Sequence, residues 1–144
     1  MARYDKYGPK TGGFRAPLAA AWNATSGPAG VTDLNRVIVV GLNASGQVIK
    51  ATAAIAAVGI LILSEAHAAG DIVDVMTAGE VFDLSAADIQ GASAPTAGTQ
   101  YVLDTTASRL AAQAGVPTAG TNFFRVGTTV EAARLVVRCG LLQG

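Results

Sequence analysis

Residues 58–84 read VGILILSEAHAAGDIVDVMTAGEVFDL, and this stretch decides the fold class. Its first six residues form a continuous apolar run, which is typical of a short strand covered on both faces. A turn at Gly70 and Asp71 leads into residues 71–76, whose side chains alternate between two faces as those of a strand do. Gly79 predicts a second turn before a third strand at residues 80–84. The stretch therefore predicts an all-β protein.

The same signals recur through the rest of the chain. Residues 43–46 predict a hairpin turn, because Gly46 can adopt a positive φ. Ser85 and Asp88 predict one capped helical turn, in which the Asp88 carboxylate reaches back to the start of the turn. Many short strands separated by Gly-rich turns favour a small β-barrel or a β-sandwich. The further strands are expected at residues 36–42, 47–51, 100–104, 109–113, 123–130 and 134–139.

The first 31 residues lack this periodicity and are interrupted by turn signals such as Gly8-Pro9 and Gly27-Pro28. Only residues 18–23 (LAAAWN) favour a short helical patch. We therefore expect two parts, an extended N-terminal arm at residues 1–31 and a β-rich body at residues 32–144. The arm holds four basic residues and one acidic residue, whereas the body holds six basic and nine acidic residues. This opposite charge favours contacts between copies, or docking on an acidic surface.

Aromatic side chains in the arm predict that it becomes ordered against a partner, because a solvated tail usually carries fewer of them. For Trp22, packing on the protein's own body is the alternative. The residues that we expect to contact a partner are Arg3, Tyr4, Lys6, Tyr7, Lys10, Phe14, Arg15 and Trp22.

Length and composition exclude several classes of protein. The 144 residues predict a single folded core, and a formal net charge of zero argues against nucleic-acid binding. The longest apolar run, residues 53–63, is too short to span a bilayer, and the N-terminus lacks the apolar core of a secretory signal. With one cysteine, the chain has no internal disulfide framework. We expect a soluble protein that is made inside the cell and has no membrane partner.

No catalytic motif is recognisable. His67 and Cys139 are far apart in sequence, so a Cys–His pair would need the fold to bring them together. The acidic residues of the central region match neither an EF-hand loop nor a glycosidase site, and an acidic rim in solvent explains them better. A hard cation bound at this rim is the alternative. No phosphate-binding glycine loop occurs, and we expect neither an enzyme nor a cofactor or metal site. The six acidic residues are Glu65, Asp71, Asp74, Glu80, Asp83 and Asp88.

Three segments, taken in order, resemble the capsid decoration (cement) proteins of tailed bacteriophages. They are the hairpin RVIVVGLNASGQVIKAT, the central AAGDIVDVMTAGEVFDL, which follows the strand VGILIL, and the C-terminal FRVGTTVEAARLVVRC. The resemblance covers roughly residues 33–139. It implies a small β-rich body, possibly of the β-tulip type, that forms a homotrimer on the capsid exterior of the virion and stabilises the shell. The implied partners are the major capsid protein and other copies of the chain, with residues 1–31 as the arm.

Two other functions fit parts of the pattern. GDIVDVMTAGEV is similar to the hairpin of biotinyl and lipoyl carrier domains, but the turn after Val75 has no lysine, and Lys50 lies in a different hairpin. A module that binds glycans or a host surface would need an exposed aromatic platform, which only Tyr101, Phe123 and Phe124 could supply.

Overall fold

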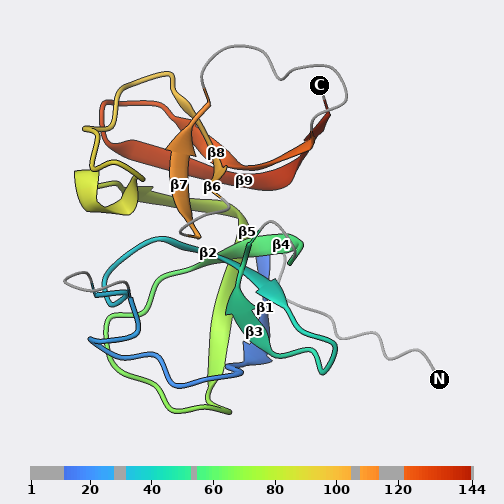
Figure 1. The fold of residues 1–144 in the computed structure, drawn as a ribbon. Coiled ribbons are helices and arrows are strands. Elements are labelled where there is room, and N and C mark those ends of the chain that lie inside the picture. The colour runs from blue at the N-terminus through green and yellow to red at the C-terminus, as the bar shows by residue number, and fades with distance from the viewer. Residues whose placement is uncertain (1–11, 28–31, 53–54, 105–107, 114–121, 144) are drawn as a thin grey trace.

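The computed structural model describes residues 12–27, 32–52, 55–104, 108–113 and 122–143 (Figure 1). Its described part is all-β, which confirms the fold class, and its only helical element is the 3₁₀ turn η1 (Ala86–Asp88). No helix within these ranges is long and apolar enough to cross a membrane. The strands are β1 (Gly12–Pro17), β2 (Ile38–Leu42), β3 (Val48–Lys50), β4 (Ala57–Leu61), β5 (Ile72–Asp83), β6 (Gln100–Asp104), β7 (Arg109–Ala112), β8 (Asn122–Thr129) and β9 (Arg134–Gln143).

All these strands belong to one antiparallel sheet in the order β3-β2-β4-β5-β9-β8-β6-β7, with β1 paired to β5. The sheet curls into a half-barrel, and two contacts bring its far ends together. Val39 of β2 donates its backbone N–H to the carbonyl of Ser108 (2.8 Å), just before β7. The Ser108 hydroxyl donates in turn to the carbonyl of Ala51 (2.5 Å), just after β3. In Figure 1, β6 to β9 form an upper lobe and β1 to β4 a lower one.

Two apolar clusters fill the two lobes, and β2 and β4 contribute to both. Val39 and Ile60 point into the first cluster, together with Tyr101, Leu110 and Leu135. Their neighbours on the same strands, among them Ile38 and Leu61, point into the second cluster around Leu18 and Trp22. A strand that buries alternate side chains on opposite sides needs apolar residues throughout. This confirms that the run at residues 58–63 is covered on both faces.

The two strands expected at residues 71–76 and 80–84 are one continuous strand, β5, of 12 residues. Gly79 has a φ of +87°, but it lies in a register shift between Ala78 and Val81 rather than in a turn. A bulge of this kind bends a strand and increases its twist without ending it. The bend lets β5 run from the lower lobe, where it pairs with β1, into the upper lobe, where it pairs with β9 (Figure 1).

The expected boundary between arm and body at residue 31 is wrong, because residues 12–27 are built into the body. β1 pairs along the free edge of β5, from Gly12 opposite Ala78 to Pro17 opposite Ile72. The expected helical patch at residues 18–23 is also absent, since Trp22 and His67 exchange backbone hydrogen bonds of 2.9 Å as strand residues do. Residues 1–11 lie outside the described part of the chain.

Candidate functional site

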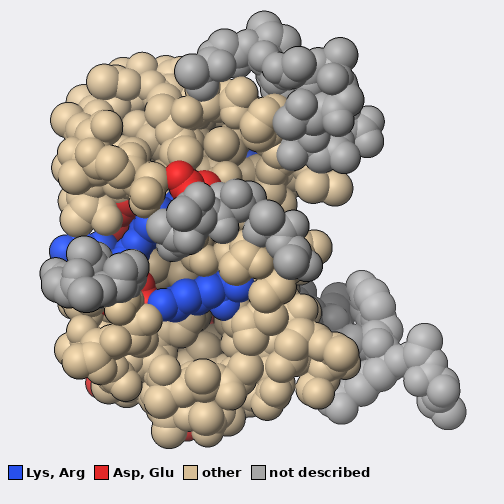
Figure 2. All heavy atoms as spheres, viewed as in Figure 1, with Lys and Arg blue, Asp and Glu red and all other residues tan. Residues whose placement is uncertain are grey.

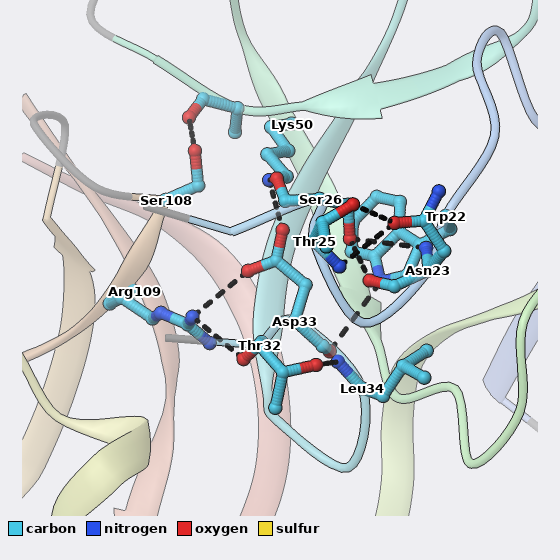
Figure 3. A network of polar contacts seen from close by, with 11 residues as sticks. Trp22, Asn23, Thr25, Ser26, Thr32, Asp33, Leu34, Lys50, Ser108 and Arg109 are labelled. Carbon is cyan, nitrogen blue, oxygen red and sulfur yellow. Dashed lines mark hydrogen bonds and ion pairs between the residues drawn. The ribbon is translucent and has the colours of Figure 1, made fainter. Parts of the chain in front are cut away.

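The most distinctive polar feature is a network of buried charges centred on Asp33 (Figure 3). Asp33 is 1% exposed, and one of its carboxylate oxygens accepts a hydrogen bond of 2.9 Å from Nη2 of Arg109 at the start of β7. The other oxygen pairs with Nζ of Lys50 at the end of β3. Arg109 is 4% exposed, so its pair with Asp33 joins the two lobes of the fold away from water.

The N-terminal segment completes this network. Nζ of Lys50 also donates to the carbonyl of Ser26 (2.6 Å) and lies 5.2 Å from the centre of the Trp22 ring, within cation–π range. Nε1 of Trp22 donates to the backbone carbonyl of Asp33 at 3.4 Å. The Asp33 carboxylate therefore binds side chains from β3 and β7, and its backbone carbonyl accepts from the side chain of Trp22, so one residue joins three segments that are far apart in sequence (Figure 3).

A second carboxylate, that of Asp88, is buried close to Arg109. Its Oδ1 accepts from the backbone N–H of Val37 (3.0 Å), and its Oδ2 accepts from both the N–H and the hydroxyl of Ser85 (2.7 Å each). The predicted cap of the turn at residues 85–88 is therefore confirmed. Burial lowers the pKa of Arg109, and the negative charges of Asp33 and Asp88 partly offset this effect. In Figure 2, basic and acidic atoms gather where the two lobes meet. We call the charged cluster of Asp33, Lys50, Asp88 and Arg109 the waist.

The predicted partner residues divide into three groups. Phe14 and Arg15 lie on β1, where Phe14 is half-buried against the second cluster and Arg15 is exposed and pairs with Asp74 (2.7 Å). The hydrogen bond from Arg15 lowers the pKa of the Asp74 carboxyl. Trp22 is 5% exposed within the second cluster, so its side chain packs on its own body and offers no surface to a partner. The remaining five lie outside the described residues: Arg3, Tyr4, Lys6, Tyr7 and Lys10.

His67 and Cys139 lie in different surroundings. Nδ1 of His67 lies 3.5 Å from the Asp71 carboxylate, in a loop that pairs with Trp22. Cys139 lies on β9 against the first cluster, with its Sγ 3.8 Å from the carbonyl oxygen of Val126. Burial raises the pKa of Cys139 to about 11, the direction opposite to that of an activated thiolate nucleophile.

Cys139 is therefore expected to react slowly in the folded protein. A pKa raised from 9.0 to about 11 lowers the thiolate fraction near pH 8 about 100-fold. The folded state holds the thiol proton more tightly than the unfolded chain does. The contribution of Cys139 to the free energy of unfolding is therefore complete below about pH 9 and is lost as the pH rises towards 11. Rates of alkylation by iodoacetamide at pH 8, with and without urea, test this expectation. Equal rates in both conditions would contradict it.

The acidic residues of the central region do not gather into one site. Within the described ranges, no three His, Cys, Asp or Glu side chains are placed to hold a metal ion. Asp74 pairs with Arg15 and Asp83 with Arg134, both at the surface, whereas Asp88 is buried. The expected solvated rim thus describes most of these acids but not Asp88.

The aromatic platform expected for a glycan-binding module is not available as a unit. Tyr101 is 1% exposed inside the first cluster, and Phe124 packs against the same cluster. Phe123 is half-buried. Lys50, which a carrier domain would need as a free reactive lysine, is held by Asp33 and Ser26. The described residues therefore provide neither an aromatic surface for a glycan nor a free lysine for a carrier domain.

A groove of about 540 Å³ lies beside the pairing of β1 with β5. Phe14, Met76 and Ile62 supply its apolar lining, and Asp74 and Glu80 its acidic groups. Large apolar side chains are also exposed singly on several elements, which is common on soluble proteins. The most exposed are Ile72, Val81, Val130 and Leu141.

Comparisons with known proteins identify a similar fold. A solved structure from Mycobacterium phage Patience superposes with a TM-score of 0.64 over 99% of this chain and 97% of that chain, at 18% sequence identity. No protein-family model matches the chain, and no curated protein does. At this level of identity the similarity shows a shared fold.

Proposed function

We propose that the protein is a structural component of a bacteriophage virion that binds the capsid exterior and stabilises the shell as a decoration, or cement, protein. The observation that carries the proposal is the structural similarity to the chain from Mycobacterium phage Patience, which covers 99% of this chain and 97% of that one. The similarity extends over both lobes rather than over one local motif. The cement role itself is supported by the sequence resemblance to capsid decoration proteins, which rests on three segments that occur in the same order along the chain: residues 36–52, 68–84 and 124–139.

The proposed partners are the major capsid protein and two further copies of this chain in a homotrimer. Contacts of modest strength suffice for such a role, because a shell offers many equivalent sites and linked binding multiplies weak affinities. The surface offers apolar contacts of this kind, since Leu141 is 73% exposed and Val130 60%. No catalytic step, cofactor or metal belongs to the proposed function.

Particles of the encoding phage that lack this protein test the proposal. We expect the purified protein to co-sediment with such particles and to raise the temperature at which they release DNA. Light scattering of the free protein would give its oligomeric state. A protein that neither binds the particles nor changes their release temperature would refute the proposed function, whereas a monomer or dimer would refute only the trimer.

Residues 1–11 provide a second test. We expect deletion of residues 1–11 to weaken particle binding, because it removes Arg3, Lys6 and Lys10 while β1 and Trp22 stay in place. Circular dichroism and thermal unfolding should match those of the full chain. If the truncated protein binds particles as tightly as the full chain does, these basic residues do not contribute, and the surface of the body carries the interaction.

A further inference from the structure

Strand β5 exposes different sides to solvent in the two lobes that it joins (Figure 1). In the lower lobe, Val73 and Val75 point into the second cluster, so the alternate side chains, Asp74 among them, face solvent. In the upper lobe the core lies on the other side of the strand, because Phe82 packs against the first cluster and Val81 is 52% exposed. The two exposed surfaces of β5 therefore lie on opposite sides of the strand.

The lower surface is the groove beside β1, and its charged lining is acidic overall. Ile62 and Met76 are half-buried and give the groove apolar contact area. Arg15 and Asp74 neutralise one another through their ion pair. Glu80 is the remaining charged residue of the lining, and it has no ion-pair partner among the residues that the structure describes. The groove thus combines apolar side chains with one unmatched carboxylate.

The upper surface is the outer side of β9 and of the strands beside it. Leu135 and Val137 are fully buried in the first cluster, so Val136 between them faces outwards. Val81 of β5 lies directly opposite Val136, and the two side chains form one apolar patch. Arg138, two residues further along β9, is exposed on the same side as this patch.

The charges of this upper surface are three cations and two carboxylates. Arg134 is matched by Asp83 (3.2 Å) and by Glu131 (3.4 Å). Arg138 has no ion-pair partner within the described ranges. Arg125 on β8 lies beside it, since Nε of Arg125 donates to the backbone carbonyl of Arg138 (3.1 Å). The outer side of β9 therefore combines an apolar patch with unmatched positive charge.

We propose that these two surfaces bind one another between copies of the chain, so that the outer side of β9 in one copy covers the groove of the next and Arg138 pairs with Glu80. The surfaces are complementary in charge, and both expose apolar side chains. They lie on opposite sides of β5, so they cannot meet within one molecule, and the contact runs head to tail. Contacts of this kind form a ring when the rotation between copies closes. The inference rests on the homotrimer of the proposed function, for which it names the interface.

Charge reversal at the two unmatched residues tests this interface. Light scattering measures the oligomeric state of the free, full-length protein over a range of concentrations. We expect Glu80→Lys and Arg138→Glu each to raise the concentration at which half of the chains assemble by about tenfold or more, because each change brings like charges together. The double variant, Glu80→Lys with Arg138→Glu, is expected to recover assembly, since it restores an opposite pair with its polarity reversed.

The matched control is Glu65→Lys, which makes the same change at an exposed carboxylate that does not line the groove and is expected to assemble as the wild type does. Circular dichroism checks the fold of each variant, and Arg138→Glu, at an exposed side chain, decides if Glu80→Lys does not fold. A monomeric wild type, single variants that assemble like the wild type, or a double variant no better than the single ones would overturn this interface. A wild-type trimer that the variants leave intact refutes only the interface, and particle binding tests the cement role separately.

Discussion

Replacing Asp33 with alanine is expected to destabilise the fold by about 3–5 kcal/mol, the usual cost of removing one partner from a buried ion pair. Lys50 has a side chain that is 32% exposed and can turn towards water, but the Arg109 side chain is 5% exposed and keeps its charge buried. Because small domains are stable by about 5–15 kcal/mol, the loss would take a large share of the total. Urea unfolding followed by circular dichroism measures it.

The matched control is Asp83→Ala, which breaks the surface pair with Arg134 and is expected to cost less than about 1 kcal/mol. A double variant, Asp33→Ala with Arg109→Met, is expected to recover part of the loss, because it also removes the buried charge that Asp33 balances. If Asp33→Ala costs no more than Asp83→Ala, the network does not stabilise the protein as its burial implies.

Deletion of residues 1–27 is expected to unfold the body. The deletion removes β1 from the edge of β5 and takes Leu18 and Trp22 out of the second cluster. Losing a buried leucine costs about 2–5 kcal/mol and losing a buried tryptophan about 3–5 kcal/mol, so the two together approach the whole stability of a domain. Circular dichroism and the dispersion of amide signals in NMR spectra report the loss of structure.

A single substitution tests the same point without removing chain. Trp22→Ala is expected to lower the free energy of unfolding by about 3–5 kcal/mol, whereas Leu141→Ala, at a side chain that is 73% exposed, is expected to change it by less than about 0.5 kcal/mol. A body that stays folded without residues 1–27, together with a small effect of Trp22→Ala, would restore the arm as a separate segment.

The β pattern of the sequence predicts most of the fold. Alternating or continuous apolar runs mark strands wherever a strand has one or two buried faces, and Gly46 and Gly70 adopt the positive φ that their turns require. The strand expected at residues 100–104 has the bounds of β6, and the cap of η1 follows from Ser85 and Asp88. These features are local, so the residues that determine them are close together in the chain.

Two errors of prediction have a common cause. Gly79 has the same positive φ in a bulge as it would have in a turn, and only the pairing of β5 with β9 decides between them. Likewise, GGFRAP at residues 12–17 is a weak strand sequence, yet it forms β1 because the edge of β5 provides hydrogen-bonding partners. In both places a neighbouring strand, which is distant in sequence, decides the outcome.

In the candidate site, too, local sequence predicts some features and contacts between distant segments decide the others. The sequence identified Trp22 as important but left open whether it faces a partner or the body, and its burial against the second cluster decides for the body. The sequence did not predict the Asp33 network. A charged residue beside an apolar strand, as at Asp33 and Arg109, is a sign of a buried charge, but these two residues are 76 positions apart, so the sequence does not show that they pair.

By itself, the sequence determined the all-β class, most of the strands and the scarcity of catalytic motifs, because each depends on residue types within a few positions of one another. Only the tertiary structure decided which segments belong to the body, how β5 joins the lobes and which charges meet at the waist. Those contacts form when the sheet curls and brings Ser108 against β2, and no local pattern encodes that closure.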